Sequence, residues 1–126
     1  MTPGGSQNVA CIRQNAKVTD LPSEDDFRLA AVGYWMGIRD SSAEEANAAT
    51  ARGNEIVRLW RAHAVAEDHL RRLLSDESDE VRYAAAAHLG NSDAAAIDVL
   101  RELTRNPQGF VAPTAELLLM RWTHDG

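Results

Sequence analysis

Two histidines and the acids between them come closest to a metal-binding pattern in this sequence. His63 and His69 flank Glu67 and Asp68, and all four side chains carry groups that can bind a metal. Two ligands on one helical face need a spacing of three or four residues, whereas these histidines are six residues apart. We therefore expect solvated side chains at helix ends. His88, in an alanine-rich segment, is expected to pack beside a turn.

The single cysteine and an acidic turn are the other places where reactive groups could act. Cys11 lies in a segment without sustained periodicity, whereas a reactive thiolate needs a structured, positive niche. The acidic run 76–80 lacks the glycine at the bend and the terminal bidentate Glu of an EF-hand, so we expect it to cap a helix. Neither a glycine-rich phosphate loop nor a Ser-His-Asp pattern is present. The sequence predicts no catalytic residue, no cofactor and no metal.

A polar stripe on the longest predicted helix is the main candidate binding surface. Asn47 and Asn54 are seven residues apart and therefore lie on one helical face, which Thr50, Arg58 and Arg61 extend. Asn is disfavoured inside helices, so two of them indicate a specific hydrogen-bonding role. They either satisfy buried backbone of a neighbouring helix or contact a partner or ligand. Beside this polar stripe runs an apolar face of Ala46, Ala49, Gly53, Val57, Trp60 and Ala64.

Hydrophobic periodicity and capping residues predict an all-α chain of about six helices without a sheet. Ser23 stands before three acids, which suits the positive start of a helix. Gly90 is expected to close the fourth helix in a left-handed conformation, Ser92 to cap the fifth, and Pro113 to lie in the first turn of the sixth. The expected ranges are 23–38, 43–64, 66–75, 79–89, 92–105 and 110–122.

Composition and net charge limit the classes of protein to which this chain can belong. With 126 residues, 44% of them hydrophobic, the chain suits one globular domain, which we place at 23–126 after a flexible tail at 1–22. A net charge of −6 disfavours nucleic-acid binding. The longest apolar run, 29–38, is half of the roughly 20 residues that a membrane span needs. No signal peptide is visible, so a soluble, cytoplasmic protein is expected.

An internal repeat appears when the chain is shifted by 30 residues against itself. The unit is one helix, a polar turn, and a second helix with a small residue at its centre. Such a unit cannot bury its apolar face alone, so neighbouring units are expected to stack. The identical pairs are Leu70 and Leu100, Arg71 and Arg101, Leu73 and Leu103, Val81 and Val111, Ala85 and Ala115, and Leu89 and Leu119.

The first repeat unit resembles the HEAT-like repeat of the phycobilisome-lyase type, which combines an acidic turn, a Val-Arg pair, an Ala pair and Leu-Gly. Here these are Asp76, Val81-Arg82, Ala85-Ala86 and Leu89-Gly90. The second unit departs from the pattern, with Ala112 in the place of Arg82, and looks like a truncated end cap. The resemblance implies that Arg82 is a structural residue that reaches an acid or carbonyl in the adjacent turn.

Residues 24–122 are similar to a family of short bacterial HEAT-like proteins described only as a domain of unknown function. No activity is established for that family, so the resemblance implies the fold and leaves the function open. Trp60 and Trp122 are expected to be structural. The shared residues are Phe27, Ala46-Asn47, Asn54, Val81-Arg82, Ala115-Glu116, Leu119 and Trp122.

The first predicted helix is apolar at every position from Leu29 to Ile38, so something must cover its second side. We consider the tail around Val9 and Ile12, a second copy of the chain, or a partner protein. Val32 and Met36 are the positions that would distinguish these occupants.

We therefore expect a non-catalytic protein–protein interaction module, of which an immunity or antitoxin protein is one form. The alternative from another class is a ligand-binding or enzymatic helical domain with a groove near Asn47, Asn54 and Trp60. A HEAT-like nucleic-acid binder is a third class, which the net charge of −6 disfavours.

Overall fold

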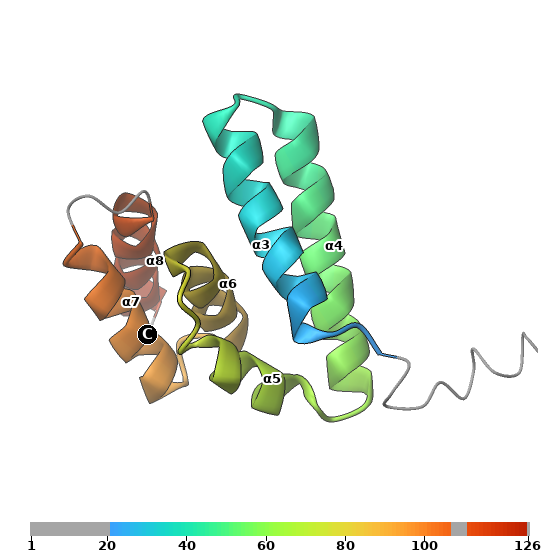
Figure 1. Cartoon of the computed structure of the whole chain (residues 1–126). Helices are drawn as coiled ribbons and strands as arrows, with labels where there is room; N and C mark the ends of the chain where they lie inside the picture. Colours follow the sequence, from blue (N-terminus) through green and yellow to red (C-terminus); the bar gives the residue numbers. More distant parts are fainter. Residues whose placement is uncertain (1–20, 107–110, 126) are drawn as a thin grey trace, which may run out of the picture.

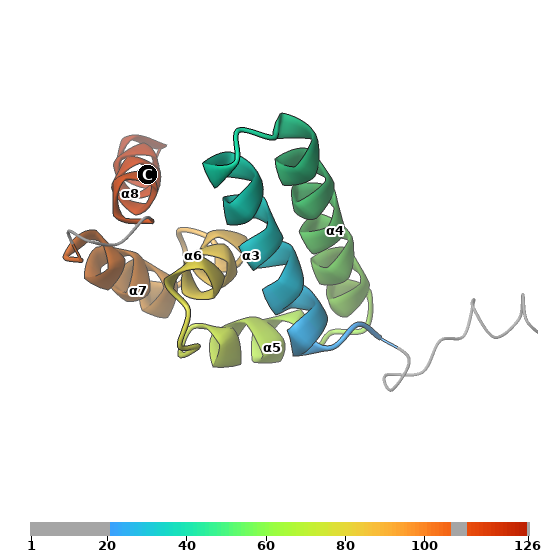
Figure 2. The same ribbon diagram turned by 45° about the horizontal axis from the view of Figure 1, so that its top comes forward.

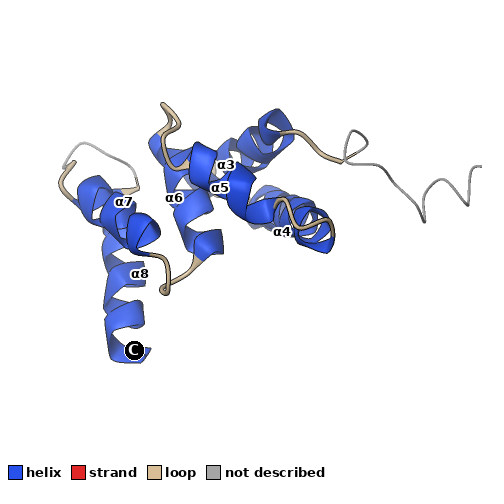
Figure 3. Ribbon diagram, turned by 90° about the horizontal axis from the view of Figure 1, so that it is seen from below, coloured by secondary structure: helices blue, strands red, loops and turns tan. Residues whose placement is uncertain are grey.

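The computed structural model describes residues 21–106 and 111–125, and within these ranges it contains six helices and no strand (Figures 1 and 3). The predicted all-α class is thus confirmed. None of the described helices has the length and apolar character of a membrane span. The helices are α3 (Glu24–Arg39), α4 (Ala43–Ala62), α5 (Ala66–Leu73), α6 (Asp79–Leu89), α7 (Ala94–Thr104) and α8 (Ala112–Asp125).

From one side of the molecule to the other the helices follow the order α4, α3, α6, α7 and α8 (Figure 1). α3 and α4 form a long antiparallel hairpin with the most extensive interface, and α6 packs against α3 (Figure 1). α7 lies against the other side of α6, and α8 against α7 (Figure 2). The short α5 links the hairpin to α6. α3, α6 and α7 thus each pack against at least two other helices, as in a layered helical protein.

Local capping chemistry sets most helix ends. Ser23 forms the predicted capping box with Asp26, and Gly90 ends α6 as predicted, with a φ of +91° but a ψ of 175°, which lies outside the left-handed helical conformation. The cap of α7 is a correction: Asp93, not Ser92, accepts hydrogen bonds from the first-turn amides. A carboxylate one residue later serves the same purpose.

The far ends of three helices also differ from the prediction by two or more residues. α5 ends at Leu73 rather than 75. α4 ends at Ala62, and Ala64 lies in the following turn, exposed, with a φ of +58°. The apolar face predicted for this helix therefore does not extend to Ala64. The last helix runs to Asp125 rather than 122.

The core is built from the inner faces of all six described helices. Its largest fully buried side chains include Trp60, Phe27 and Ile56. Leu21 packs against this core and the carbonyl of Pro22 accepts a 2.8 Å hydrogen bond from Trp60 Nε1, so the packed body includes two residues that the sequence placed in the tail. The apolar repeat positions Leu70, Leu100, Leu73, Leu103, Val81, Val111, Ala85 and Ala115 are all buried.

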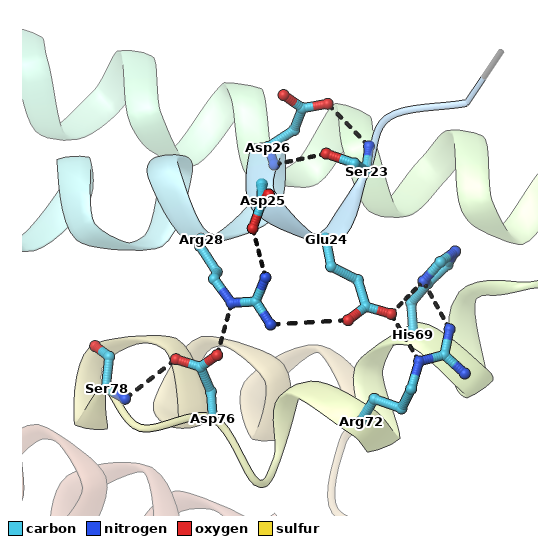
Figure 4. Close-up of polar contacts among 9 residues, drawn as sticks. All are labelled: Ser23, Glu24, Asp25, Asp26, Arg28, His69, Arg72, Asp76 and Ser78. Atoms are coloured by element: carbon cyan, nitrogen blue, oxygen red, sulfur yellow. Dashed lines mark hydrogen bonds and ion pairs between the residues drawn. The ribbon is translucent and has the colours of Figure 1, made fainter. Parts of the chain in front are cut away.

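Charged side chains join the start of α3 to α5 and the turn before α6 (Figure 4). Arg28 Nε donates to Asp76 at 2.6 Å, and the Glu24 carboxylate lies 2.8 Å from both His69 Nδ1 and Arg72 Nε. Burial opposes the ionisation of Glu24, but the hydrogen bonds from His69 and Arg72 outweigh it and hold the pKa of this carboxyl below its usual value. The acidic turn thus contributes to packing through Asp76.

Only one side of α3 is covered by described residues. Ala30, Ala31 and Trp35 are buried, whereas Leu29, Val32 and Met36 are 74%, 36% and 45% exposed. We call these three residues the outer stripe. The helix is therefore apolar on a face that the rest of the described body leaves open, and Val9 and Ile12, in one of the three occupants considered for it, lie outside the described residues.

Arg82 links α6 to α7. It pairs with Asp79 in its own helix, and its Nη1 donates to Glu102 of α7 at 3.1 Å. Its side chain is only 23% exposed. This placement agrees with a structural role in which the guanidinium reaches acids across a helix interface.

We expect Arg82→Ala to lower the free energy of unfolding by about 1–2 kcal/mol, because it leaves Asp79 without its partly buried partner. Arg58→Ala is the matched control, since Arg58 is exposed and pairs only with Glu55 three residues earlier. Urea denaturation of both variants measures how much each substitution lowers the free energy of unfolding. Equal effects would contradict a structural role for Arg82.

Candidate binding groove

A groove of about 320 Å³ opens between α3, α4 and α6. Aromatic and small residues line it, and no Asp, Glu, Lys or Arg is among the described residues that do so. The aromatic lining residues are Phe27, Tyr34, Trp35 and Tyr83, the small ones Ala30, Ala31, Ala49, Gly53, Ala84 and Ala87, and the polar ones Thr50, Asn54 and His88.

The aromatic lining residues are held by contacts within the groove. Trp35 meets Tyr34 and Tyr83 edge to face, with ring centroids 5.2 and 5.7 Å apart. At the other end, His88 meets Phe27 edge to face at 5.7 Å. Because these rings interlock across two helices, the shape of the groove is built into the packing and does not depend on a ligand.

The small lining residues explain why a groove exists here. α3 and α4 approach closely where Gly53 faces Ala30, and a Cβ on Gly53 would lie 3.8 Å from the Ala30 Cβ. On α6, Ala84 and Ala87 present only methyl groups towards the hairpin. Larger side chains at these positions would fill the space that the flanking rings enclose.

The structure divides the predicted polar stripe of α4. Thr50 and Asn54 line the groove, whereas Asn47 is exposed outside its lining. Asn47 and Asn54 are both exposed, which disfavours the interpretation that they satisfy buried backbone of a neighbouring helix. At these exposed positions, both side chains are free to contact a partner protein or a ligand.

The two arginines of the polar stripe have protein partners. Arg58 is exposed and its Nε donates to Glu55 at 2.8 Å. Arg61 spans from α4 to α6, where its Nη2 donates to the carbonyl of His88 at 2.8 Å. A second, more polar hollow of about 330 Å³ lies beside this bond, between α4, α5 and α6. Arg61 therefore helps to position a helix that lines the groove.

Two titratable side chains of the groove have shifted pKa values. Burial, with a smaller contribution from the Arg61 charge, lowers the pKa of His88 below its usual value. Burial, followed by the neighbouring Tyr34, raises the pKa of the Tyr83 hydroxyl. Both groups are therefore uncharged at neutral pH, and the groove presents an uncharged surface.

His88 should make stability depend on pH. The folded protein disfavours protonated His88, so protons bind the unfolded chain more strongly and stability falls as the pH drops from about 6.5 through the folded-state pKa. In His88→Asn this loss should be smaller when urea unfolding is followed from pH 7 to 5. Glu24 does not obscure the effect. Because its pKa is lowered, its contribution to stability is lost only at more acidic pH. Identical pH profiles of the two proteins would contradict the burial of a neutral His88.

The remaining predicted residues lie away from the groove. Trp60 is fully buried between Phe27 and His69, with ring centroids at 5.7 and 4.3 Å, and Trp122 packs at the edge of the core. Val32 and Met36 belong to the outer stripe. Within the described residues no three His, Cys, Asp or Glu side chains are grouped as a metal site would require.

Sequence reasoning missed Tyr34, Tyr83 and His88 as groove residues. Tyr34 was counted only as part of an apolar run, and nothing in the sequence places Tyr83 or His88 beside α3. One signal is present: four consecutive alanines, 84–87, indicate a helix that a neighbouring helix can approach closely.

Comparisons with protein-family models, with curated proteins and with solved structures found no match to this chain.

Proposed function

We propose that this protein is a non-catalytic interaction module whose groove binds an apolar segment of a partner protein. The observation that supports this proposal is the groove itself: it is open and lined by aromatic and small residues. Its volume of about 320 Å³ suits a few large apolar side chains. An amphipathic helix that presents such anchors at spacings of three and four residues is the partner element that fits this shape.

The chemistry of the lining supports binding rather than catalysis. A general acid or base must gain or lose a proton near the working pH. Among the described lining residues, His88 is the one whose side chain ordinarily does so near neutral pH. His88 already meets Phe27 with its ring. Apolar burial with a few polar contacts, from Thr50 and Asn54, is the interaction this surface offers.

The class of partner follows from charge. The chain carries a net charge of −6, which favours the approach of a basic partner and repels a nucleic acid. A small acidic protein of stacked, HEAT-like helix pairs that neutralises a basic partner is of the immunity or antitoxin type, and we propose this as the finer form of the function.

A small-ligand-binding domain is the second candidate. The groove volume lies at the lower end of the range for small-molecule sites, and the Asn54 amide and the Thr50 hydroxyl could orient a polar group. Such a ligand would bind without a polypeptide partner. The two candidates therefore differ in the mass of the species that occupies the groove.

Site-specific photocrosslinking distinguishes them. We would place p-benzoylphenylalanine at Asn54 in the groove and, as a control, at Ala51, an exposed residue of the same helix outside the lining. After irradiation in the producing cells, the proposal predicts protein adducts at position 54 and none at position 51. The captured protein should then bind the purified wild-type chain in a calorimetric titration.

Ala87→Glu should weaken binding, because Ala87 is an exposed residue of the groove lining and a carboxylate there opposes apolar contact. We expect at least a tenfold weaker Kd for Ala87→Glu and no change for Ala51→Glu. A small molecule seen by native mass spectrometry, without any protein adduct, would favour the second candidate instead.

A further inference from the structure

We propose that protonation of His88 weakens the hold of the groove on its apolar occupant, so that binding at this site is lost as the pH falls. The inference rests on the proposed function and adds its regulation. It starts from the position of His88, which is the one described residue that lines both the apolar groove and the polar hollow beside it. An occupant that fills the groove therefore contacts His88.

Neighbours on two helices hold His88 at this end of the groove. Its ring meets that of Phe27 on α3 edge to face, with the ring centroids 5.7 Å apart. Its carbonyl accepts a 2.8 Å hydrogen bond from Nη2 of Arg61, which ties the end of α6 to α4. The imidazole is thus part of the surface that an occupant meets.

The groove offers no acidic partner to a protonated His88. No Asp or Glu is among the described residues that line it, and α3 contributes only uncharged side chains. The other titratable groups of this lining, Tyr34 and Tyr83, lie with Trp35 at the opposite end. A positive charge on His88 would therefore be the only one in the described groove lining.

The polar hollow on the other side of His88 does not neutralise this charge either. There α4 contributes the cationic Arg61, and α5 contributes Glu67, whose carboxylate lies 3.9 Å from Nη2 of Arg71. Asp93, at the start of α7, lies 2.8 Å from the same arginine and lines neither hollow. Burial, followed by the Arg61 charge, accordingly lowers the pKa of His88.

Proton linkage gives the direction and the size of the effect. A charged imidazolium needs water, and an apolar occupant excludes water, so the occupied groove disfavours protonation more strongly than the free groove does. His88 then has a lower pKa in the complex, and the affinity falls as the pH drops through the pKa of His88 in the free protein. One pH unit below that pKa, binding should be about tenfold weaker than at neutral pH.

Titration of the full chain with an uncharged apolar fluorophore, N-phenyl-1-naphthylamine, tests the proposal from pH 7.5 to 4.5. Ala87→Glu should weaken binding of this probe at pH 7.5 and Ala51→Glu should not, which locates the probe in the groove. We expect the Kd of the wild type to rise about tenfold one pH unit below the His88 midpoint, and that of His88→Asn to rise less than about twofold. Circular dichroism at each pH identifies the range in which both proteins are folded. An equal rise in both would overturn the proposal.

Imidazole NMR of the wild type supplies a second readout, which needs no substitution at His88. Saturating probe should move the midpoint of the His88 titration to lower pH and leave the imidazole signals of His63, which lines neither hollow, unchanged. An unmoved midpoint, or a His88 that does not titrate while the chain is folded, would overturn the regulation and leave the proposed function standing. A probe that binds at no pH would instead contradict the proposed function, and this inference with it.

Discussion

Gly37→Ala should lower the free energy of unfolding by about 2 kcal/mol, although alanine is the better helix former by about 1 kcal/mol. A Cβ at Gly37 would lie 2.6 Å from the backbone nitrogen of Ala46 and 3.0 Å from its Cα. Backbone atoms cannot rotate away as a side chain does, so α3 and α4 would have to separate. The Gly37 carbonyl also accepts a 2.8 Å hydrogen bond from the Ser42 amide, which the separation would strain.

Gly33→Ala is the matched control, one turn earlier on the same helix. A Cβ there would lie 3.5 Å from the Ala49 Cβ, an ordinary packing distance. This variant should therefore gain the helix propensity of alanine and be as stable as the wild type or slightly more stable. Urea unfolding of both variants gives the comparison, and a Gly37→Ala protein as stable as Gly33→Ala would show that the hairpin is not packed as closely as described.

Trp60→Ala should have the largest effect of any single substitution proposed here, about 3–5 kcal/mol. Trp60 is fully buried, stacks on Phe27 and His69, and donates its Nε1 hydrogen to the Pro22 carbonyl. Truncation removes a large core contact where α3, α4 and α5 meet. Since small domains have only about 5–15 kcal/mol of stability, thermal unfolding should occur at a much lower temperature.

Two companion variants separate the contributions of Trp60. Trp60→Phe keeps most of the apolar contact and loses the bond to Pro22, so it should cost about 1–2 kcal/mol. Trp122→Ala removes a half-buried ring at the edge of the core and should cost less than Trp60→Ala. If Trp122→Ala proved the more damaging of the two, the core would centre on α8 rather than on the hairpin.

Helix positions were predictable because their determinants are local. Ser23, Ser42 and Ser78 accept hydrogen bonds from amides in the first turn of the helix that follows, so a few residues decide where each helix starts. Ser92 and Asp93 are adjacent and both can cap a helix, so local chemistry predicts the start of α7 only to within one residue. In the structure Asp93 is the cap. The end of α4 is also set locally: Ala64 is exposed with a φ of +58°, and the amides of Ala64 and Val65 donate to the carbonyls of Arg61 and Trp60.

The candidate site was predictable only in part. Periodicity identified the helix face that carries Thr50 and Asn54, because residues at helical spacing share a face in any fold. It could not show whether that face is buried, and the structure leaves Asn47 and Asn54 exposed. Which side chains oppose Asn54 across the groove depends on how α6 crosses the hairpin.

The sequence by itself thus determined an all-α chain, the approximate bounds of its helices and which residues form their apolar faces, since capping and periodicity act over a few residues. Only the tertiary structure decided that Tyr83 meets Trp35, that His88 meets Phe27, and that the outer stripe of α3 stays uncovered by described residues. Phe27 and His88 are 61 residues apart in the chain. Their proximity arises from the angle at which α6 packs on α3, and that angle depends on the fit of many side chains at once.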